Sequence, residues 1–436
     1  MKMSVSNRIL MLVENLPYPQ DRRVRREATA LVAAGYQVSV ICPSLPDQPL
    51  RETVNGVRVY RYRAPQQADG FLGYLWEYGY SMVAAFLISL RVFFSEGFDL
   101  IHAHNPPDTF VFIAAFFKLF GKRFIYDHHD LSPEMYYARF PGGGSAIVYR
   151  VLIWLEKLSC RLADHVIATN ESYRKMDMQR SHVPERRITV VRNWTDLHLR
   201  PPAKPDPALR AMGKTIIGYV GVMGSQDGVD YLLRALHHLV HELGRTDFYC
   251  VLIGSGNAWP GLKVLAKELA VDDFVRFTGF ISDGEVLSYL SAADICVDPD
   301  PSNPFNDRST MIKMMEYMAL GKPIVAFDLT EHRFTAEQAA MYVTPNDERA
   351  FARALAQLMD SPARRLAMGI IGRRRIETKL AGPFVIPKLL AMYQGILPRP
   401  EAAVQTDVTS VTAEVYPLPP LLPRARTVSC KPADSP

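Results

Sequence analysis

Residues 303–327 read NPFNDRSTMIKMMEYMALGKPIVAF, and this segment joins a polar loop, a short helix and a buried strand. Ser309 or Thr310 can cap the predicted helix with a side-chain oxygen, and Gly321 is suited to end it. Its buried side is supplied by four methionines: Met311, Met314, Met315 and Met318. The apolar run Ile324–Phe327 then predicts a buried strand. The segment therefore reads as a ligand-binding loop that leads into a helix and a strand.

The start of this helix is a candidate anion site. Its first backbone N–H groups have no partner within the helix and lie at the positive end of the helix dipole, so a phosphate is favoured there. Glu316 lies about a turn and a half further in, where a ribose would fall if a diphosphate sat on the helix start. The alternative is that Glu316 pairs with Lys313 on a solvated helix face.

These residues resemble the retaining glycosyltransferases of family 4. That family has the GT-B fold, an α/β architecture of two doubly wound parallel-sheet, Rossmann-like domains facing across a cleft. Its motif is a Glu, seven residues, a second Glu that binds the nucleotide ribose, and an Ala-x-Gly-x-Pro turn. The matching residues are Glu316, Ala319, Gly321 and Pro323. Arg308, with Asp307 beside it, stands where the family has its first Glu, which contacts the donor sugar.

The resemblance also implies where the rest of the donor binds. Around Val222 the family places an Arg before a Lys-Gly pair, which this chain lacks, so Arg308 and Lys313 are the cations expected near a donor diphosphate. Phe280 matches a segment that contacts the nucleobase, with a buried core Phe as the alternative, and Gly254 either shapes the donor pocket or makes a tight turn. The expected donor-binding residues are Gly221, Val222, Met223, Gly254, Phe280, Ile281, Asp307, Arg308, Ser309, Thr310, Met311, Ile312, Lys313 and Glu316.

A histidine in the first half of the chain is a second candidate for chemistry. The sequence YDHHD, residues 126–130, ends a predicted strand, and the family carries a His near the reacting sugar in a similar segment. His129 matches that position better than His128, so His129 and Glu316 are the expected catalytic residues. The alternative is a structural histidine at the end of a strand.

Two further features of the first half concern metals and the acceptor. His102 and His104 share one face of a predicted strand, but no acidic third ligand is evident. We therefore expect these two histidines to be pocket-wall or core residues, and we expect no metal or other cofactor. In the family the loop after the first strand meets the acceptor. Pro17, Arg22 and Arg23 are therefore expected to bind an anionic acceptor, with a solvated basic helix face as the alternative.

The order of strand-like and helix-like segments predicts two domains. Residues 1–196 form an expected N-terminal acceptor-side domain, and a Pro-rich linker follows at 197–214. Residues 215–382 form an expected nucleotide-sugar-binding domain. Residues 383–397 are expected to cross back as a helix to the first domain, as in the family, and the Pro-rich tail at 398–436 is expected to be disordered.

Composition bounds the cellular setting. Five scattered cysteines suit a reducing cytoplasm, and the longest uncharged apolar run, 78–90, is too short for a bilayer span of about 20 residues. Residues 1–196 carry the whole formal net charge of +5, and aromatic segments at 75–94 and 110–124 have basic residues near their ends. An interfacial membrane helix would look like this, although ordinary core helices are slightly favoured. The net charge and the aromatic segments together still predict peripheral attachment to an anionic membrane surface. Nucleic-acid binding is not expected.

Taken together, these features predict a cytoplasmic, metal-independent, retaining hexosyltransferase. It would move a sugar from a nucleotide-diphosphate donor to an acceptor hydroxyl, which the resemblance suggests belongs to a polyprenyl-diphosphate-linked saccharide in surface or exopolysaccharide biosynthesis. Two other interpretations stay open. A sugar-nucleotide epimerase or hydrolase of the same fold would release nucleotide without an acceptor, and a non-catalytic nucleotide-sugar-binding protein would bind without turnover.

Overall fold

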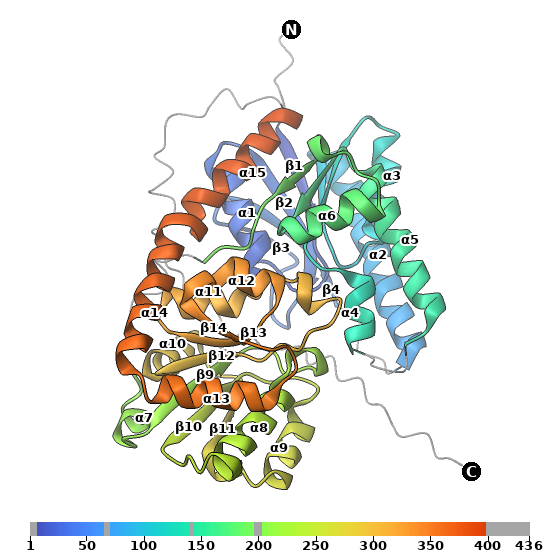
Figure 1. Ribbon diagram of the computed structural model, residues 1–436. Coiled ribbons are helices and arrows are strands. Elements are labelled where there is room, and N and C mark those ends of the chain that lie inside the picture. Colours follow the sequence, from blue (N-terminus) through green and yellow to red (C-terminus); the bar gives the residue numbers. More distant parts are fainter. Residues whose placement is uncertain (1–6, 65–69, 140–143, 196–202, 398–436) are drawn as a thin grey trace, which may run out of the picture. The chain divides into compact units, whose positions relative to one another are not determined.

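The computed structural model describes residues 7–64, 70–139, 144–195 and 203–397 (Figure 1). These residues form two compact units. Unit 1 comprises the described residues up to Asn193 together with those from Val385 onward, and unit 2 comprises those of Trp194–Phe384. The tail for which disorder is expected, 398–436, lies outside the described residues, as does the first part of the expected linker, 197–202.

An eight-stranded sheet forms the centre of unit 1, in the order β3-β4-β2-β1-β5-β6-β7-β8. Its strands are β1 (Arg8–Leu12), β2 (Gln37–Ser44), β3 (Arg51–Val54), β4 (Val57–Arg63), β5 (Leu100–His104), β6 (Arg123–His128), β7 (His165–Ala168) and β8 (Ile188–Val190). Neighbouring strands pair in parallel, apart from the antiparallel pair β3–β4. The central strands β1 and β5 are almost wholly buried, as expected for a sheet covered by helices on both faces.

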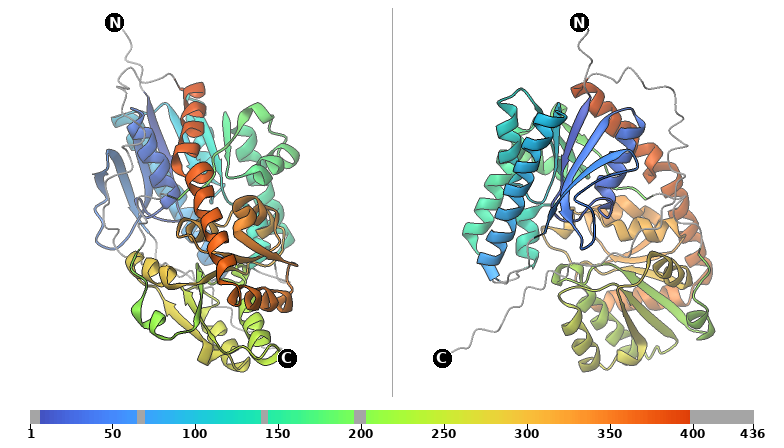
Figure 2. Two further views of the ribbon diagram at one scale, coloured as in Figure 1. Left: turned by 60° about the vertical axis from the view of Figure 1, so that its left-hand side comes forward. Right: turned by 180° about the vertical axis from the view of Figure 1, so that it is seen from behind.

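Helices cover both faces of this sheet. They are α1 (Arg22–Ala33), α2 (Gly70–Ser95), α3 (Phe110–Lys118), α4 (Ser132–Arg139), α5 (Ala146–Leu162), α6 (Glu171–Arg180) and, from Val385 on, α15 (Gly382–Ile396). Figure 2 shows α2, α3 and α5 together on one face, and α1 and α15 on the other. Asp21 begins α1 by accepting a hydrogen bond from the Val24 backbone N–H at 2.9 Å, which is a typical N-cap.

Unit 2 has a six-stranded, wholly parallel sheet in the order β11-β10-β9-β12-β13-β14. Its strands are β9 (Thr215–Val220), β10 (Phe248–Ile253), β11 (Val275–Gly279), β12 (Ile295–Asp298), β13 (Ile324–Phe327) and β14 (Ala340–Val343). The helices are α7 (Pro207–Ala211), α8 (Val229–His237), α9 (Trp259–Glu268), α10 (Asp283–Ala292), α11 (Ile312–Ala319), α12 (Thr330–Ala336), α13 (Glu348–Met359) and α14 (Pro362–Arg375). The expectation of two doubly wound parallel domains is thus confirmed.

Two elements differ from the expectation. Strand β3 was not predicted, and it pairs with β4 through a turn at Asn55 and Gly56, whose φ angles are 51° and 77°. The expected linker contains helix α7, which Asp206 caps by accepting from the Leu209 N–H at 2.9 Å. Both elements are short and lie outside the apolar periodicity from which the longer elements were predicted.

Helix α2 is longer and more apolar than its uninterrupted apolar run suggested. Including its two charged residues, Trp76–Ser95 is long and apolar enough to cross a membrane by length and composition, with a mean hydropathy of 1.4. The expectation that no described segment is long enough was therefore wrong, because it stopped at Arg91. The helix packs on β2 and β4, yet only 22% of its most apolar window is buried.

Candidate functional site

The donor-side residues expected in unit 2 follow the carboxyl ends of its strands. Gly221, Val222 and Met223 follow β9, Gly254 follows β10, Phe280 and Ile281 follow β11, and a 3-10 helix at Asn306–Arg308 follows β12. Strand β9 pairs with both β10 and β12, and the strand order reverses between β9 and β12. Open parallel sheets bind ligands at such a switch point, so the fold brings these residues to the expected edge.

The loops after β9 and β10 touch backbone to backbone. Gly254 has φ of +124°, and a Cβ on it would lie 2.0 Å from the carbonyl oxygen of Gly221. The Met223 N–H also donates to the Ser255 carbonyl at 3.1 Å. Gly254 therefore serves both a turn and a close approach of two loops. Beside it Phe280 is 47% exposed, which rules out the alternative of a buried core phenylalanine.

The start of α11 differs in detail from the expectation. The helix begins at Ile312, and its N-cap residue is Met311, which makes no side-chain capping bond. Ser309 instead donates its hydroxyl to the Phe305 carbonyl at 2.8 Å, and the Thr310 hydroxyl lies 3.4 Å from a carboxylate oxygen of Glu331. The expected cap by Ser309 or Thr310 is therefore wrong, because a 3-10 turn already occupies that part of the loop.

Lys313 is not the accessible cation that the sequence suggested. Its side chain is 10% exposed, and Nζ lies 3.2 Å from Asp298 and donates to Asp300. Burial lowers the pKa of Lys313, but the two carboxylates outweigh burial and raise it well above its usual value. Burial and the neighbouring Asp298 raise the pKa of Asp300. Lys313 thus forms ion pairs with two aspartates of unit 2.

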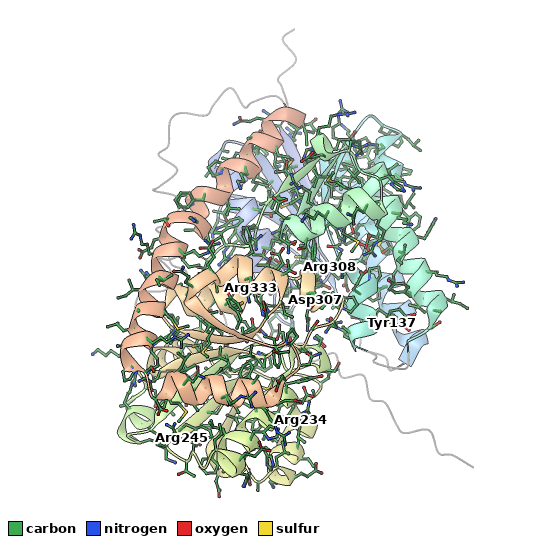
Figure 3. The ribbon with its side chains drawn as sticks, viewed as in Figure 1. Tyr137, Arg234, Arg245, Asp307, Arg308 and Arg333 are labelled. Carbon is green, nitrogen blue, oxygen red and sulfur yellow. The ribbon has the colours of Figure 1, made fainter. Side chains whose placement is uncertain are left out.

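Glu316 lies within α11, whereas Asp307 and Arg308 precede the helix, and their surroundings differ. Glu316 is 7% exposed, so the alternative of a solvated helix face is wrong. Asp307 and Arg308 are half-buried in the 3-10 helix (Figure 3), and Arg308 donates to the Pro304 carbonyl at 2.6 Å. Asn306 fastens this loop by donating to the carbonyl of Gln226 at 2.9 Å, which ties the loop after β12 to the one after β9.

Unit 1 contains a buried ion-pair network at its own switch point, where β1 pairs with both β2 and β5. Arg23 on α1 makes a two-pronged contact with Asp127 on β6, through Nε at 2.7 Å and Nη2 at 2.8 Å. Arg23 also donates to the Val191 carbonyl at 3.2 Å and to Asn193 at 3.0 Å. Its side chain is 7% exposed, so neither an accessible acceptor-binding arginine nor a solvated helix face describes Arg23. Glu27 is the second carboxyl group in this network, and its Oε1 lies 3.2 Å from Arg23 Nη2.

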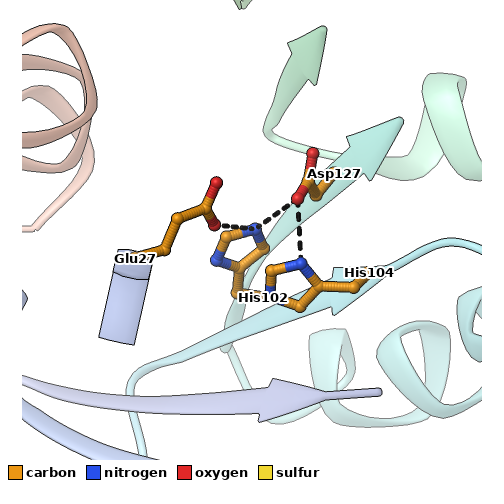
Figure 4. A group of neighbouring side chains, drawn as sticks. All are labelled: Glu27, His102, His104 and Asp127. Atoms are coloured by element: carbon orange, nitrogen blue, oxygen red, sulfur yellow. Dashed lines mark hydrogen bonds and ion pairs between the residues drawn. The ribbon is translucent and has the colours of Figure 1, made fainter. Parts of the chain in front are cut away.

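Figure 4 shows four side chains of this network that could ligate a metal: Glu27, His102, His104 and Asp127. Their ligand atoms lie within 4.8 Å of one another, so the acidic ligands that the sequence did not reveal are present. However, the Asp127 oxygen nearest to His104, at 2.8 Å, already accepts from Arg23. A divalent ion there would face a buried guanidinium, so the residues are better suited to an ion-pair network than to a metal centre.

The protonation of this network follows from Arg23. Burial raises the pKa of Asp127, but Arg23 outweighs burial and lowers the pKa well below its usual value. Glu27 shares the same guanidinium less closely, and burial raises its pKa to about 7. Burial lowers the pKa of His102 well below its usual value, and its Nδ1 lies 2.7 Å from the Tyr393 hydroxyl of α15. The cluster therefore holds one firmly ionised carboxylate, Asp127, at its centre.

His129 is the histidine of this region that the structure leaves partly accessible. Its side chain is 16% exposed, and its Nδ1 lies 3.5 Å from Asp127. Burial lowers the pKa of His129, but Asp127 outweighs burial and raises it. The side-chain oxygen of Asn105, just after β5, accepts from the His129 N–H at 2.8 Å and fixes the loop. An ionised aspartate and an asparagine thus orient the expected catalytic histidine.

His128, by contrast, points into the core. Its Nδ1 lies 2.6 Å from Asp177, and its Nε2 lies 3.7 Å from Glu156. Burial lowers the pKa of His128, but Asp177 outweighs burial and raises it to about 9. The sequence preference for His129 over His128 thus agrees with their positions, although their roles stay predictions.

The His128 pair makes stability depend on pH. Because the folded pKa is raised, its contribution is fully present below about pH 6.5 and is lost as pH rises through about 9. We expect the free energy of unfolding of the protein, relative to His128→Gln, to fall by about 3 kcal/mol between pH 6.5 and 9.5. Urea unfolding at both pH values measures this, with His241→Gln at an exposed position as the control. A difference that stays constant across this range would contradict the assignment.

The remaining acceptor-side residues lie beside the network. Pro17 is buried after β1, and Arg22 is half-buried at the first position of α1. Sequence reasoning missed Asp127 and Glu27 in unit 1, and Asp298 and Asp300 in unit 2, as charge partners. Asp298 ends the buried strand β12 and Asp300 follows it in the sequence DPD, and such a position is a signal that could have found them.

Comparison with known proteins supplies the family. The description "Glycosyl transferase 4-like domain" matches residues 20–194, and "Glycosyl transferases group 1" matches residues 214–361. The chain is a group 1, family 4-like glycosyltransferase. This glycosyltransferase is 29% identical over 307 residues to an uncharacterized glycosyltransferase of Methanocaldococcus jannaschii, a match that covers 68% of this chain and 73% of the relative.

Solved structures agree with the GT-B fold of this glycosyltransferase. A sucrose-phosphate synthase from Thermosynechococcus elongatus superposes with a TM-score of 0.75 at 21% identity, covering 89% of this chain and 99% of that one. HepE from Anabaena, in complex with UDP-glucose, superposes with a TM-score of 0.64 at 16% identity, covering 89% and 99%. The enzyme belongs to a family of retaining hexosyltransferases and transfers a sugar from a nucleotide-sugar donor.

Proposed function

We propose that the donor of this glycosyltransferase binds at the switch point of unit 2. The observation that carries the proposal is that α11 meets the end of β9. The Val220 N–H donates to the Tyr317 hydroxyl at 2.9 Å, and Lys313 Nζ lies 5.1 Å from the centre of the Tyr219 ring. These contacts hold α11 beside the end of β9, at the carboxyl edge of the sheet.

At this edge each expected residue has a task. The backbone N–H groups at the start of α11 would hold the diphosphate, and Glu316 would accept from the ribose hydroxyls. The exposed ring of Phe280 would contact the base. Two cations, Arg308 and Lys313, were expected near the donor diphosphate. Because Lys313 forms ion pairs with two aspartates, Arg308 would stabilise the departing nucleoside diphosphate.

The acceptor side belongs to unit 1 in this proposal. His129, whose pKa Asp127 raises, would donate a hydrogen bond to the transferred sugar. The acceptor hydroxyl would belong to a polyprenyl-diphosphate-linked saccharide, and the enzyme would work at the cytoplasmic face of a membrane. Two observations support this setting: four described cysteines are free thiols, and α2 keeps a largely exposed apolar side.

Glu316→Ala tests the donor site. We expect donor use, measured as kcat/KM for the nucleotide sugar, to fall by about 10- to 100-fold, because a charged hydrogen-bond partner contributes about 1.5–3 kcal/mol. Glu268→Ala, at an exposed position of α9, is the matched control and should leave kcat/KM unchanged. Parent-like kinetics of a folded Glu316→Ala enzyme would refute the proposed donor site.

The same assay separates the alternatives. Nucleotide release at the same rate with and without acceptor would favour an epimerase or hydrolase. Tight nucleotide binding without turnover, across a panel of lipid-linked acceptors, would favour a binding protein. A thermal-shift screen with nucleoside diphosphates identifies the base first, since a ligand at a hundred times its Kd stabilises by about 2.7 kcal/mol.

A further inference from the structure

Helix α2 has its apolar side turned away from the protein. The side that packs on the sheet contains the small or polar residues Ser81, Ala85 and Ser89, each 2% exposed or less. The opposite side carries large apolar residues at helical spacing: Trp76, Tyr80, Val83 and Leu87. A surface helix of a protein that meets only water shows the reverse arrangement. The expectation of ordinary core helices in this region is therefore wrong for the outer side of α2.

The exposed apolar side continues over α3 and α5. Phe86 of α2 and Phe116 of α3 have ring centres 5.1 Å apart, so the two helices are packed together. Phe112 of α3 and Trp154 of α5 have ring centres 6.3 Å apart, and both are about half exposed. We call the following residues the outer apolar face: Trp76, Tyr80, Val83, Leu87, Phe112, Ile147, Val151 and Trp154. Contiguous apolar surface of this kind marks an interaction site, and Figures 1 and 2 show the three helices side by side.

The exposed charges on these three helices have one sign. The two acidic residues of the three helices, Glu77 and Glu156, are buried, at 8% and 0% exposure. Basic residues of the same helices are exposed, among them Arg91, Arg150 and Arg161. An apolar centre with aromatic residues and a basic surround complements a surface that is apolar within and negative outside. A second copy of this chain would instead bring its own basic residues against these.

We propose that the outer apolar face binds the interfacial layer of an anionic phospholipid bilayer. Trp76 and Trp154 enter the headgroup region together with the aliphatic side chains between them, while Arg91 and Arg150 contact lipid phosphates. The attachment is peripheral, because α2 stays packed on β2 and β4 and its inward side holds Glu77 and three small residues. The inference rests on the membrane setting of the proposed function, but it uses no residue of the donor site, so it can fail while the proposed donor site holds.

Vesicle sedimentation of the full chain tests this directly. Vesicles of phosphatidylcholine with about a third phosphatidylglycerol should bind the protein at low salt, and binding should weaken several-fold as salt shortens the Debye length from about 10 Å at 0.1 M to about 3 Å at 1 M. The double variant Leu87→Glu/Trp154→Glu should bind at least about tenfold more weakly, since each charge would enter the apolar layer. Leu366→Glu, at a site 67% exposed on α14, is the matched control and should bind like the parent.

Other outcomes decide against the proposal. Equal binding of the double variant and the parent would overturn it, and so would equal binding to vesicles of phosphatidylcholine alone. If the parent is a dimer without lipid, and the double variant is a monomer that still binds vesicles like the parent, the face is a self-association surface instead. Tryptophan emission gives a second readout that needs no variant, because Trp76 and Trp154 should shift to shorter wavelength on binding while Trp194 is already 2% exposed.

Discussion

Asp127→Asn is expected to lower the free energy of unfolding by about 3–5 kcal/mol at pH 7, because it leaves a buried charge without its partner. Arg23 is 7% exposed and makes its two-pronged contact with this carboxylate. Asparagine has nearly the same shape, so the loss reports charge rather than packing. Urea unfolding followed by circular dichroism measures it.

The matched control for Asp127→Asn is Asp328→Asn, which removes the partner of Arg333 in an exposed pair. The two side chains there are 34% and 59% exposed, so the expected loss is below about 1 kcal/mol. The pH dependence gives a second check. The pKa of Asp127 is lowered, so its contribution is present above about pH 4 and is lost as pH falls further. Equal losses in the two variants at pH 7 would refute the network.

Asp127→Asn should also change the titration of His129. The carboxylate outweighs burial to raise the pKa of this histidine, so its loss should lower that pKa. Histidine resonances followed by NMR against pH would show the change, provided that the variant is folded at the temperature used. Unchanged titration of His129 would mean that Asp127 does not control its proton.

Lys313→Met is the second change for which we expect a large effect. The substitution keeps the apolar stem but removes the cation shared by Asp298 and Asp300, and we expect a loss of about 3–5 kcal/mol at pH 7.5. Without the cation both carboxyl pKa values should rise, so the folded state would bind more protons than the unfolded state. The loss should therefore be largest at neutral pH and smaller at pH 5.

Chemical unfolding at pH 7.5 and pH 5 measures the effect of Lys313→Met. Lys267→Met on α9 is the control, because it makes the same substitution at an exposed position of the same unit. A loss for Lys313→Met that matches the control, or that does not change with pH, would show that the two aspartates do not depend on this lysine.

The fold could be predicted from the sequence because parallel sheets produce a regular alternation of apolar strands and amphipathic helices. Strand β3 was missed since Arg51–Val54 alternates between exposed and half-buried positions. The Asn55-Gly56 pair is a recognised hairpin signal and could have found it. Elements that bury a continuous apolar run are thus predictable, and edge elements depend on turn residues.

The candidate site was predictable in its place but less so in its charges. Gly254 at the end of β10 could be placed because strand ends meet at one edge of the sheet. Glu316 could be placed because its helix, α11, follows the end of β12 at the same edge. The partners of Arg23 could not, since Asp127 is 104 residues away in sequence and only tertiary structure brings them together. Likewise the spacing of Trp76 and Leu87 shows that α2 is one-sided, but not which side faces the sheet.

The hydrogen bond between Tyr393 and His102 has a consequence for how the enzyme is made. These residues are 291 positions apart, and α15 belongs to unit 1 from Val385 on. A ribosome therefore delivers the whole of Trp194–Phe384 before the last helix of unit 1 leaves the exit tunnel. The first unit to be started is the last to be completed, which reverses the usual N-terminal-first order of domain folding during synthesis.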